Sequence, residues 1–371
     1  MNGPDPTGLR AGGRAPAIPG SPILPRSPIS LGSANTRAST PPLRRATRAL
    51  AYLILSAIVL ITLTAPFTAP YDPAAQFREH LLAPPMPLRV RDADGHWQRP
   101  FFYPLRSISR LERTFAEDRS RPVPLTLFKD GHLLRPATLA RGPWLPLGSD
   151  RLGRDIASRL VYGARVSLGV AVVAVAGALL LGLLIGTWAG MVRGLLDAAL
   201  MRLTEFVLIL PALYVVLAAR ATLPASLSPL AVFLLLAGVL AVIGWPTVAA
   251  SVRAIVRVEM TKDYVAAARA SGAGALHLLR QHLWPAAAGV LRVQALLLLP
   301  AAIMAETTLS FVGLGFDADR PSWGTLLQDA SDIRALTDYP WLLSAGGAIV
   351  LLVWALNLLL EPRDRGQGSQ A

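Results

Sequence analysis

The sequence contains no cysteine and only two lysines, Lys129 and Lys262, among its 371 residues. Without cysteine there is no disulfide, no thiolate metal site and no cysteine nucleophile. The phosphate-binding loop of nucleotide hydrolases needs Gly-Lys followed by Ser or Thr, whereas Asp130 and Asp263 follow the two lysines here. The chain therefore has no such loop, and any ATP hydrolysis that powers it has to come from a separate protein.

Charged residues are also scarce. They make up 16% of the chain, against about a quarter in ordinary soluble domains, while hydrophobic residues make up 53% and the mean hydropathy is +0.46. A membrane-crossing helix needs about 20 apolar residues. Six stretches approach or reach this length, and they predict an all-α membrane protein with about six transmembrane helices: Ala49–Phe67, Val166–Ala189, Leu200–Ala219, Leu230–Ser251, Gly289–Val312 and Leu342–Leu360.

The formal net charge of +13 does not indicate a nucleic-acid partner. Most basic residues flank the apolar stretches, where Lys and Arg set the orientation of a membrane protein. The partner that this distribution favours is the lipid bilayer.

Composition divides the chain into segments. Residues 1–43 are rich in Pro, Gly, Ser and Arg, with Asp5 the only acid, which is typical of disorder. Arginines then precede the first apolar run, which is long for a signal peptide and lacks an Ala-x-Ala site. We therefore expect an uncleaved first helix with its N-terminus inside. The expected segments are a cytoplasmic tail (1–43), the first transmembrane helix (44–68), an extracytoplasmic insert (69–160), a five-helix core (161–362) containing a cytoplasmic loop (252–285), and a cytoplasmic tail (363–371).

The charges of the shorter loops agree with this orientation. The loop between the fourth and fifth stretches is basic, with Arg253, Arg257, Lys262, Arg269 and Arg280 against Glu259 and Asp263. The loop between the fifth and sixth is acidic, with Asp317, Asp319, Asp329, Asp332 and Asp338 against Arg320 and Arg334. The basic loop is expected in the cytoplasm and the acidic loop outside it.

The insert contains the pattern Asp-Gly-His-x-x-Arg-Pro twice, beginning at Asp94 and at Asp130. Asp-Gly favours a two-residue hairpin turn, so the second copy predicts strands at Leu125–Phe128 and His132–Leu134. One interpretation is a recognition element or a metal site using His96 and His132. Two ordinary hairpins in a small β-containing insert are favoured instead, because a metal would need further ligands.

The residue pattern of the cytoplasmic loop predicts a helix–glycine–helix elbow (residues 258–285). Small residues dominate an expected helix at Val258–Ala270, Gly272 and Gly274 interrupt it, and a second helix is expected at Ala275–Leu283. Pro285 suits the first turn of the next helix. Small side chains permit close approach, so this elbow is a candidate docking surface. His277 and His282 are five residues apart and do not share an α-helical face, so no metal site is expected there.

This elbow resembles the coupling loop of ABC importer permeases, whose pattern is Glu-Ala-Ala, three residues, Gly, nine residues, then Ile-x-Leu-Pro. Gly272 and Pro285 match at the right spacing, and Ala266 replaces the glutamate. Two further stretches, Leu147–Leu168 and Glu306–Gly324, resemble the permeases of dipeptide, oligopeptide and nickel importers. The family resemblance implies that the elbow contacts an ATPase through Asp263, Ala266, Ala267, Ala268, Gly272 and Pro285.

The resemblance further implies a transport subunit of the bacterial inner membrane that is not itself an enzyme and holds no cofactor or metal. Its implied partners are a second homologous permease, cytoplasmic ABC ATPases and an extracytoplasmic solute-binding protein, and its solute would be a peptide or a related small molecule. The pattern leaves another interpretation open. Glu306 lies within an apolar stretch, where carboxylates are often functional, so it could line a translocation path, fasten the bundle, or serve an ion-gradient-driven secondary transporter.

The expected orientation is testable with reporter fusions. Fusions at both termini should report a cytoplasmic location, and a tag beside Gly131 should be accessible from outside intact cells. An external C-terminus would contradict the six-span arrangement.

Overall fold

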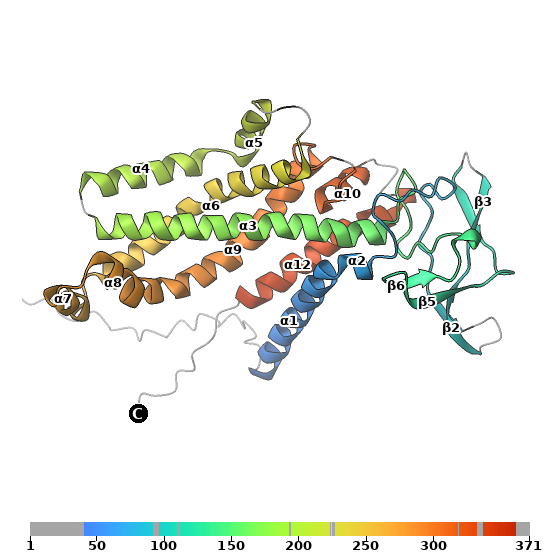
Figure 1. Cartoon of the computed structure of the whole chain (residues 1–371), viewed down its shortest axis with the longest axis horizontal. Coiled ribbons are helices and arrows are strands. Elements are labelled where there is room, and N and C mark those ends of the chain that lie inside the picture. Colours follow the sequence, from blue (N-terminus) through green and yellow to red (C-terminus); the bar gives the residue numbers. More distant parts are fainter. Residues whose placement is uncertain are drawn as a thin grey trace, which may run out of the picture. The chain divides into compact units, whose positions relative to one another are not determined.

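Long helices form the main part of the molecule (Figure 1). The computed structural model describes residues 41–91, 96–109, 112–192, 194–222, 224, 227–317, 319–331 and 337–360. The chain divides after Arg44, within α1, and the other helices and the strands belong to the unit Arg45–Ala371. The helices are α1 (Pro41–Leu63), α2 (Ala65–Thr68), α3 (Ile156–Met191), α4 (Leu195–Ile209), α5 (Ala212–Ala221), α6 (Pro229–Glu259), α7 (Asp263–Ala270), α8 (Ala275–Leu278), a π-helical turn (Leu279–Leu283), α9 (Trp284–Phe311), α10 (Trp323–Asp329) and α12 (Ser344–Leu360), with 3-10 turns at Leu139–Arg141 and Pro340–Leu343.

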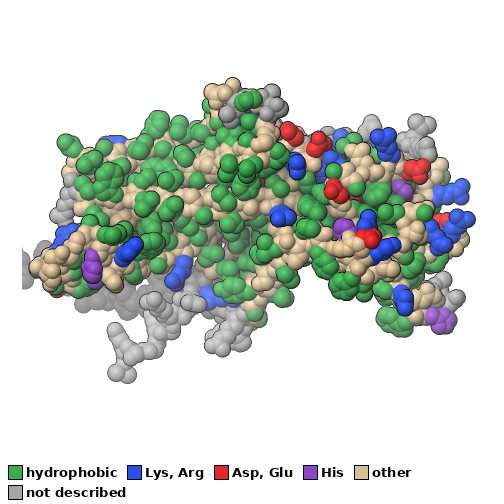
Figure 2. All heavy atoms as spheres, in the orientation of Figure 1, with side chains coloured by type: hydrophobic (Ala, Val, Ile, Leu, Met, Phe, Trp, Pro, Cys, Tyr) green, Lys and Arg blue, Asp and Glu red, His purple; other side chains and the backbone are tan. Residues whose placement is uncertain are grey.

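Within these described residues, five helical segments are long and apolar enough to cross a membrane: α1, α3, α6, the continuous helix Ala275–Phe311, and the segment Pro340–Leu360. The pair α4 and α5 would make a sixth span. Hydrophobic side chains cover the helices, while charged side chains gather over the insert and near α7 and α8 (Figure 2). The prediction of an all-α membrane protein with about six spans is confirmed.

The closest helix pair is α3 against α6. Gly182, Gly186 and Gly190 recur every fourth residue on α3, and they leave no room for a side chain. A Cβ on Gly182 would lie 2.4 Å from the Cβ of Val248, and one on Gly186 would lie 2.5 Å from the carbonyl oxygen of Ala249. Small residues at every fourth position let helix backbones approach closely in a membrane, where packing rather than water exclusion holds helices together.

The two helices run parallel. Successive contacts of α3 with α6 rise together along both sequences: Gly169 with Phe233, Gly177 with Ala241, Gly182 with Val248, and Gly190 with Val256. The chain between them therefore has to return from the C-terminal end of α3 to the N-terminal end of α6. Only the α4–α5 segment connects these ends, so it makes the sixth crossing.

That crossing is not the single helix expected over Leu200–Ala219. It breaks at Pro211, where α4 and α5 meet at an angle of 85°. Proline lacks the N–H that a helix interior requires, and it forces the preceding residue into extended backbone. Leu210 has φ −73° and ψ 117°, as this rule requires.

Other helix boundaries also differ from expectation. The first helix, expected over 44–68, is α1 from Pro41 to Leu63, and the separate α2 follows it. The helix α3 begins at Ile156, ten residues before the apolar stretch, because the Asp155 side chain accepts a hydrogen bond from the Ser158 N–H and caps it. The expected helix Val258–Ala270 does not exist as one element. Instead α6 continues to Glu259 and α7 begins at Asp263.

The insert is built from two antiparallel sheets, β1-β2-β5-β6 and β3-β4. The predicted hairpin is confirmed: Lys129 pairs with His132, and Asp130 and Gly131 have φ values of 51° and 79°, as a two-residue turn of this kind requires. The first Asp-Gly pair lies outside the described residues. The strands are β1 (Arg89–Arg91), β2 (Trp97–Phe102), β3 (Leu105–Ser109), β4 (Thr114–Glu117), β5 (Val123–Lys129) and β6 (His132–Pro136).

The α3–α6 contact yields a stability prediction. Gly186→Ala should destabilise the folded protein by about 1–3 kcal/mol, because its methyl group meets the rigid backbone of α6. Gly238→Ala is the matched control, since Gly238 lies on α6 and a Cβ there meets nothing within 4 Å. Thermal unfolding in detergent should show a lower midpoint for the first variant and an unchanged or higher midpoint for the second. Equal midpoints would contradict the packing.

Candidate functional site

The elbow begins where α6 ends. Glu259 and Lys262 form an ion pair of 2.8 Å across the short break before α7. On α7 Val265 is fully buried and fixes the helix to the body of the protein, whereas Asp263, Ala266 and Ala267 are exposed and Ala268 is half-buried. The outward side of the helix thus presents the small side chains of Ala266, Ala267 and Ala270, bordered by the larger Tyr264 and Arg269.

Gly272 ends α7 as predicted. It has φ +86°, a conformation that glycine adopts without strain. The N–H of Ala273 donates to the carbonyl of Ala268 at 3.0 Å, and the N–H of Gly272 donates to Arg269 at 2.9 Å. This pair of hydrogen bonds is the Schellman arrangement that closes a helix. A Cβ on Gly272 would meet nothing within 4 Å, so the turn faces open space.

The second arm of the elbow is continuous with the next span. The segment α8, π-helical turn and α9 runs from Ala275 to Phe311 without a break in the chain of helical residues, and Pro285 lies exposed in the first turn of α9, as expected. The π-helical turn Leu279–Leu283 precedes Pro285 and buries Leu283. A π-turn has i to i+5 hydrogen bonds and accommodates an extra residue in the helix.

The π-turn also corrects the expectation for the two histidines. Their separation of five residues matches its wider spacing, and the rings of His277 and His282 lie 6.3 Å apart, with Tyr264 5.2 Å from His282. The histidines therefore do share a face. Among the described residues no group of three His, Cys, Asp or Glu side chains is placed to hold a metal ion.

An ion-pair clamp that the sequence analysis missed braces the elbow. Asp197, at the start of α4, accepts hydrogen bonds from Arg253 Nε at 2.5 Å and Nη2 at 2.7 Å, and also from Arg257. The bidentate geometry fixes both orientation and distance. It ties α4 to the last turns of α6, directly before α7. Asp197 lies 56 residues before Arg253, so no local sequence pattern signals this contact.

Glu306 is fully buried at the far end of α9. Its Oε1 accepts a hydrogen bond from the Ser310 hydroxyl at 2.8 Å. Ser310 in turn packs closely against Gly324 of α10, and the Trp323 N–H of α10 donates to Ser167 of α3 at 3.1 Å. Glu306 thus lies where α3, α9 and α10 meet.

A groove of about 200 Å³ opens between α3, α5, α6 and α9. It is predominantly apolar, and Glu306 is not part of its wall although the neighbouring Ala305 is. The lining residues are Ala174, Val175, Ala178, Ala212, Leu240, Ile243, Gly244, Thr247, Leu298, Ala301, Ala302 and Ala305.

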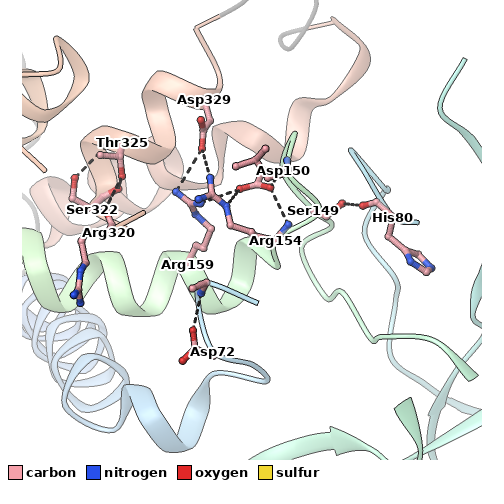
Figure 3. A network of polar contacts seen from close by, with 12 residues as sticks. Asp72, His80, Ser149, Asp150, Arg154, Arg159, Arg320, Ser322, Thr325 and Asp329 are labelled. Carbon is pink, nitrogen blue, oxygen red and sulfur yellow. Dashed lines mark hydrogen bonds and ion pairs between the residues drawn. The ribbon is translucent and has the colours of Figure 1, made fainter. Parts of the chain in front are cut away.

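At the insert end of α3, a buried cluster of four charged residues joins three segments (Figure 3). We call Asp150, Arg154, Arg159 and Asp329 the Asp150 cluster. Asp150 Oδ2 accepts from Arg154 Nε at 2.7 Å and from Arg159 Nη1 at 3.0 Å. Asp329 lies 3.7 Å and 3.6 Å from the same two arginines. Two positive and two negative charges balance, which a buried cluster requires.

The cluster explains the pattern Gly-Ser-Asp-Arg-Leu-Gly-Arg-Asp before α3. Gly148 and Gly153 both have φ +75°, and a Cβ on Gly153 would lie 2.4 Å from the carbonyl oxygen of Phe77. The turn therefore presses against the start of the insert while Asp150 points back to Arg154 and Arg159. The family resemblance includes this stretch, but its ion pairs also depend on Asp329, which is distant in sequence.

Comparison with known proteins places this geometry in a family. A model of the "binding-protein-dependent transport system inner membrane component" matches residues 182–361. The di/tripeptide transport system permease protein DppC of Pseudomonas aeruginosa is 33% identical over 310 residues, covering 83% of this chain and 82% of that protein. The chain belongs to this family of ABC importer permeases.

Other relatives agree with this permease assignment. The oligopeptide transport system permease protein OppC of Lactococcus lactis (strain IL1403) is 31% identical over 207 residues, covering 56% of this chain and 69% of that protein. The dipeptide transport system permease protein DppC of Bacillus subtilis is 37% identical over 213 residues, covering 57% and 64%. The permease is a multi-pass inner-membrane protein, and the expected family is confirmed.

Two carboxyls at the insert end of the permease, the buried Asp155 and the partly buried Asp329, have raised pKa values. Burial raises the pKa of the Asp155 carboxyl from 3.8 to about 6, against the opposing effect of its hydrogen bonds from Ser158. Burial together with the nearby negative charge of Asp150 raises the pKa of Asp329 from 3.8 to about 6. Both groups therefore hold a proton more tightly in the folded protein than in the unfolded chain.

This predicts a pH-dependent stability. A raised pKa contributes stability that is full below the ordinary value of 3.8 and is lost as the pH rises through about 6, an effect of about 3 kcal/mol for a shift of this size. Asp155→Asn keeps an acceptor for the helix cap and removes one of the two titrating groups. Unfolding midpoints between pH 4 and pH 8 should fall less steeply in this variant than in the wild type. Identical slopes would contradict the assignment.

Proposed function

We propose that this permease is the transmembrane subunit of an ATP-driven importer of peptides, powered by separate ATPase subunits that dock on the elbow. The peptide substrate is suggested by the names of the relatives, which are di/tripeptide, dipeptide and oligopeptide transport permeases. The observation that supports docking is the exposed, small-residue face of α7 beside the open turn at Gly272.

The elbow is built to pass on a displacement. Its first arm follows α6, and its second arm is continuous with α9. The whole segment Ala275–Phe311 has 37 residues and is about 55 Å long. A push on the elbow therefore reaches the groove, because α6 and α9 both supply its walls through Gly244, Thr247, Leu298 and Ala301. ATPase closure would change the separation of these walls and so alternate access to the path.

The arrangement requires partners. The groove is open on the side that this chain does not line, so a second, homologous permease would be needed to enclose a path. The permease would receive its solute from an extracytoplasmic binding protein at the insert end, with the elbow and both termini in the cytoplasm. The basic charge of the elbow loop supports this orientation. The burial of Glu306 away from the groove gives no support to an ion-gradient-driven mechanism.

The docking role is tested by a pair of glycine substitutions. Gly272→Trp should abolish most ATPase co-purification and peptide uptake, because an indole ring at the elbow prevents close approach. Gly194→Trp is the matched control: Gly194 also has a positive φ, +94°, and a Cβ there also meets nothing within 4 Å, but it lies between α3 and α4. Both variants therefore add the same bulk to an open turn, and the backbone of Gly194, with ψ −146°, tolerates a side chain no better than that of Gly272.

Both variants would be compared with the wild type for membrane insertion, ATPase retained on purification, and uptake of a labelled dipeptide. Loss of ATPase and uptake in Gly272→Trp alone is the expected result. Full retention of both in Gly272→Trp would refute docking at the elbow. Normal ATPase retention and uptake of other solutes without any peptide uptake in the wild type would refute the substrate.

A further inference from the structure

The β5–β6 hairpin of the insert rests on the end of the first span. The rings of Phe67, in α2, and Phe128, in β5, stack with centroids 5.8 Å apart and an interplanar angle of 28°. Beside them the Nδ1 atom of His132 lies 2.7 Å from the carbonyl oxygen of Ala69. The hairpin therefore keeps a fixed position relative to the end of α1.

Phe128 occupies an unusual backbone conformation for a large side chain. Its φ is +56°, which is rare for bulky residues and costs of order 1 kcal/mol or more. The strand alternation is broken there, and Leu127 and Phe128 are both outward, 58% and 69% exposed. If both side chains faced water, they would make no apolar contact that offsets this backbone strain. Such outliers cluster at sites that hold a ligand or a partner.

The apolar surface of the hairpin continues that of the membrane span. Leu60 and Leu63, in the last turn of α1, are 63% and 71% exposed, as side chains facing lipid are. Phe67 follows within α2, whose four residues rise about 6 Å. The Phe67–Phe128 stack therefore lies at the depth where a bilayer meets water, which is where membrane proteins concentrate aromatic side chains.

The charged groups at the hairpin tip are compatible with that depth. Asp130 and Arg135 form an ion pair of 3.2 Å, and the Lys129 ammonium donates to the Ala137 carbonyl at 2.6 Å. Charges with partners are tolerated at the headgroup level, where long basic side chains also reach water.

From this geometry we propose that Leu127 and Phe128 form a lipid anchor: the hairpin inserts these side chains into the interface of the bilayer leaflet next to α2. The occupant is phospholipid, because the exposed patch is continuous with the lipid-facing side of α1. The anchor would hold the insert against the membrane surface and limit its tilt relative to the helices. The inference does not depend on which solute is transported.

The absence of cysteine allows a direct test in the full-length chain. Single variants Phe128→Cys and Leu127→Cys would each be labelled with the environment-sensitive fluorophore NBD and reconstituted in phosphatidylcholine–phosphatidylglycerol liposomes. Ile108→Cys is the matched control, because Ile108 is 70% exposed but lies on β3 in the other sheet. Quenching would be measured with spin-labelled lipids, carrying the nitroxide near the headgroup or deep in the chain, and with aqueous iodide.

We expect several-fold stronger lipid quenching at positions 127 and 128 than at 108, greatest with the shallow nitroxide, and weak iodide quenching. Iodide quenching at 127 and 128 equal to that at 108 would overturn the anchor. Protection from both lipid and iodide would also overturn it, because a protein surface would then cover the hairpin. The use of two adjacent labelled positions separates the result from any local damage caused by replacing the Phe128 ring.

Discussion

The close parallel packing of α3 on α6 is the constraint on which the other features depend. Lipid provides no hydrophobic force to drive helices together, so the pair relies on backbone approach and van der Waals contact, and the glycines of α3 supply that approach. The packing makes the two helices one rigid unit, and a different group of polar contacts lies at each end. The Asp150 cluster lies at the N-terminal end of α3, and the Asp197 clamp and the elbow lie at the C-terminal end of α6.

The polar contacts at these two ends have different physical characters. Asp150, Arg154 and Arg159 of the Asp150 cluster are almost fully buried, and Asp329 is partly exposed, so separating the buried charges would leave ions in a poorly solvating environment at a cost of several kcal/mol. The cluster therefore resists motion between α3, α10 and the turn that follows the insert. The Asp197 clamp is more open, with the Arg257 side chain 43% exposed, and water can screen its charges. The ion pairs at the insert end are therefore costlier to separate than those at the elbow end.

Sequence reasoning succeeded where a local rule determines the structure. Apolar length predicted the spans, Asp130-Gly131 predicted the hairpin, and Gly272 predicted the end of α7. It failed where distant residues or rarer helix geometry decide. The span expected over Leu200–Ala219 breaks at Pro211, and the 85° angle there depends on how α4 and α5 pack. The His277–His282 contact needs a π-turn that α-helical spacing does not anticipate. The Asp150 cluster and the Asp197 clamp join residues that only the fold brings together.

The replacement of glutamate by Ala266 acquires a physical meaning from α7. Residues three apart on a helix are neighbours on its surface, so Asp263 lies beside Ala266, and both are exposed. A carboxylate is thus still present on this face, one turn earlier and in the first turn of the helix, where the helix dipole favours a negative charge. Ala266 itself adds no charge to this face, which the exposed Arg269, three residues further on, also borders. A partner groove that received a second carboxylate there would have to provide a matching positive charge, since burial of an unpaired charge is strongly unfavourable. We infer that docking at the elbow depends chiefly on the close fit of small side chains, with one charged contact displaced to Asp263.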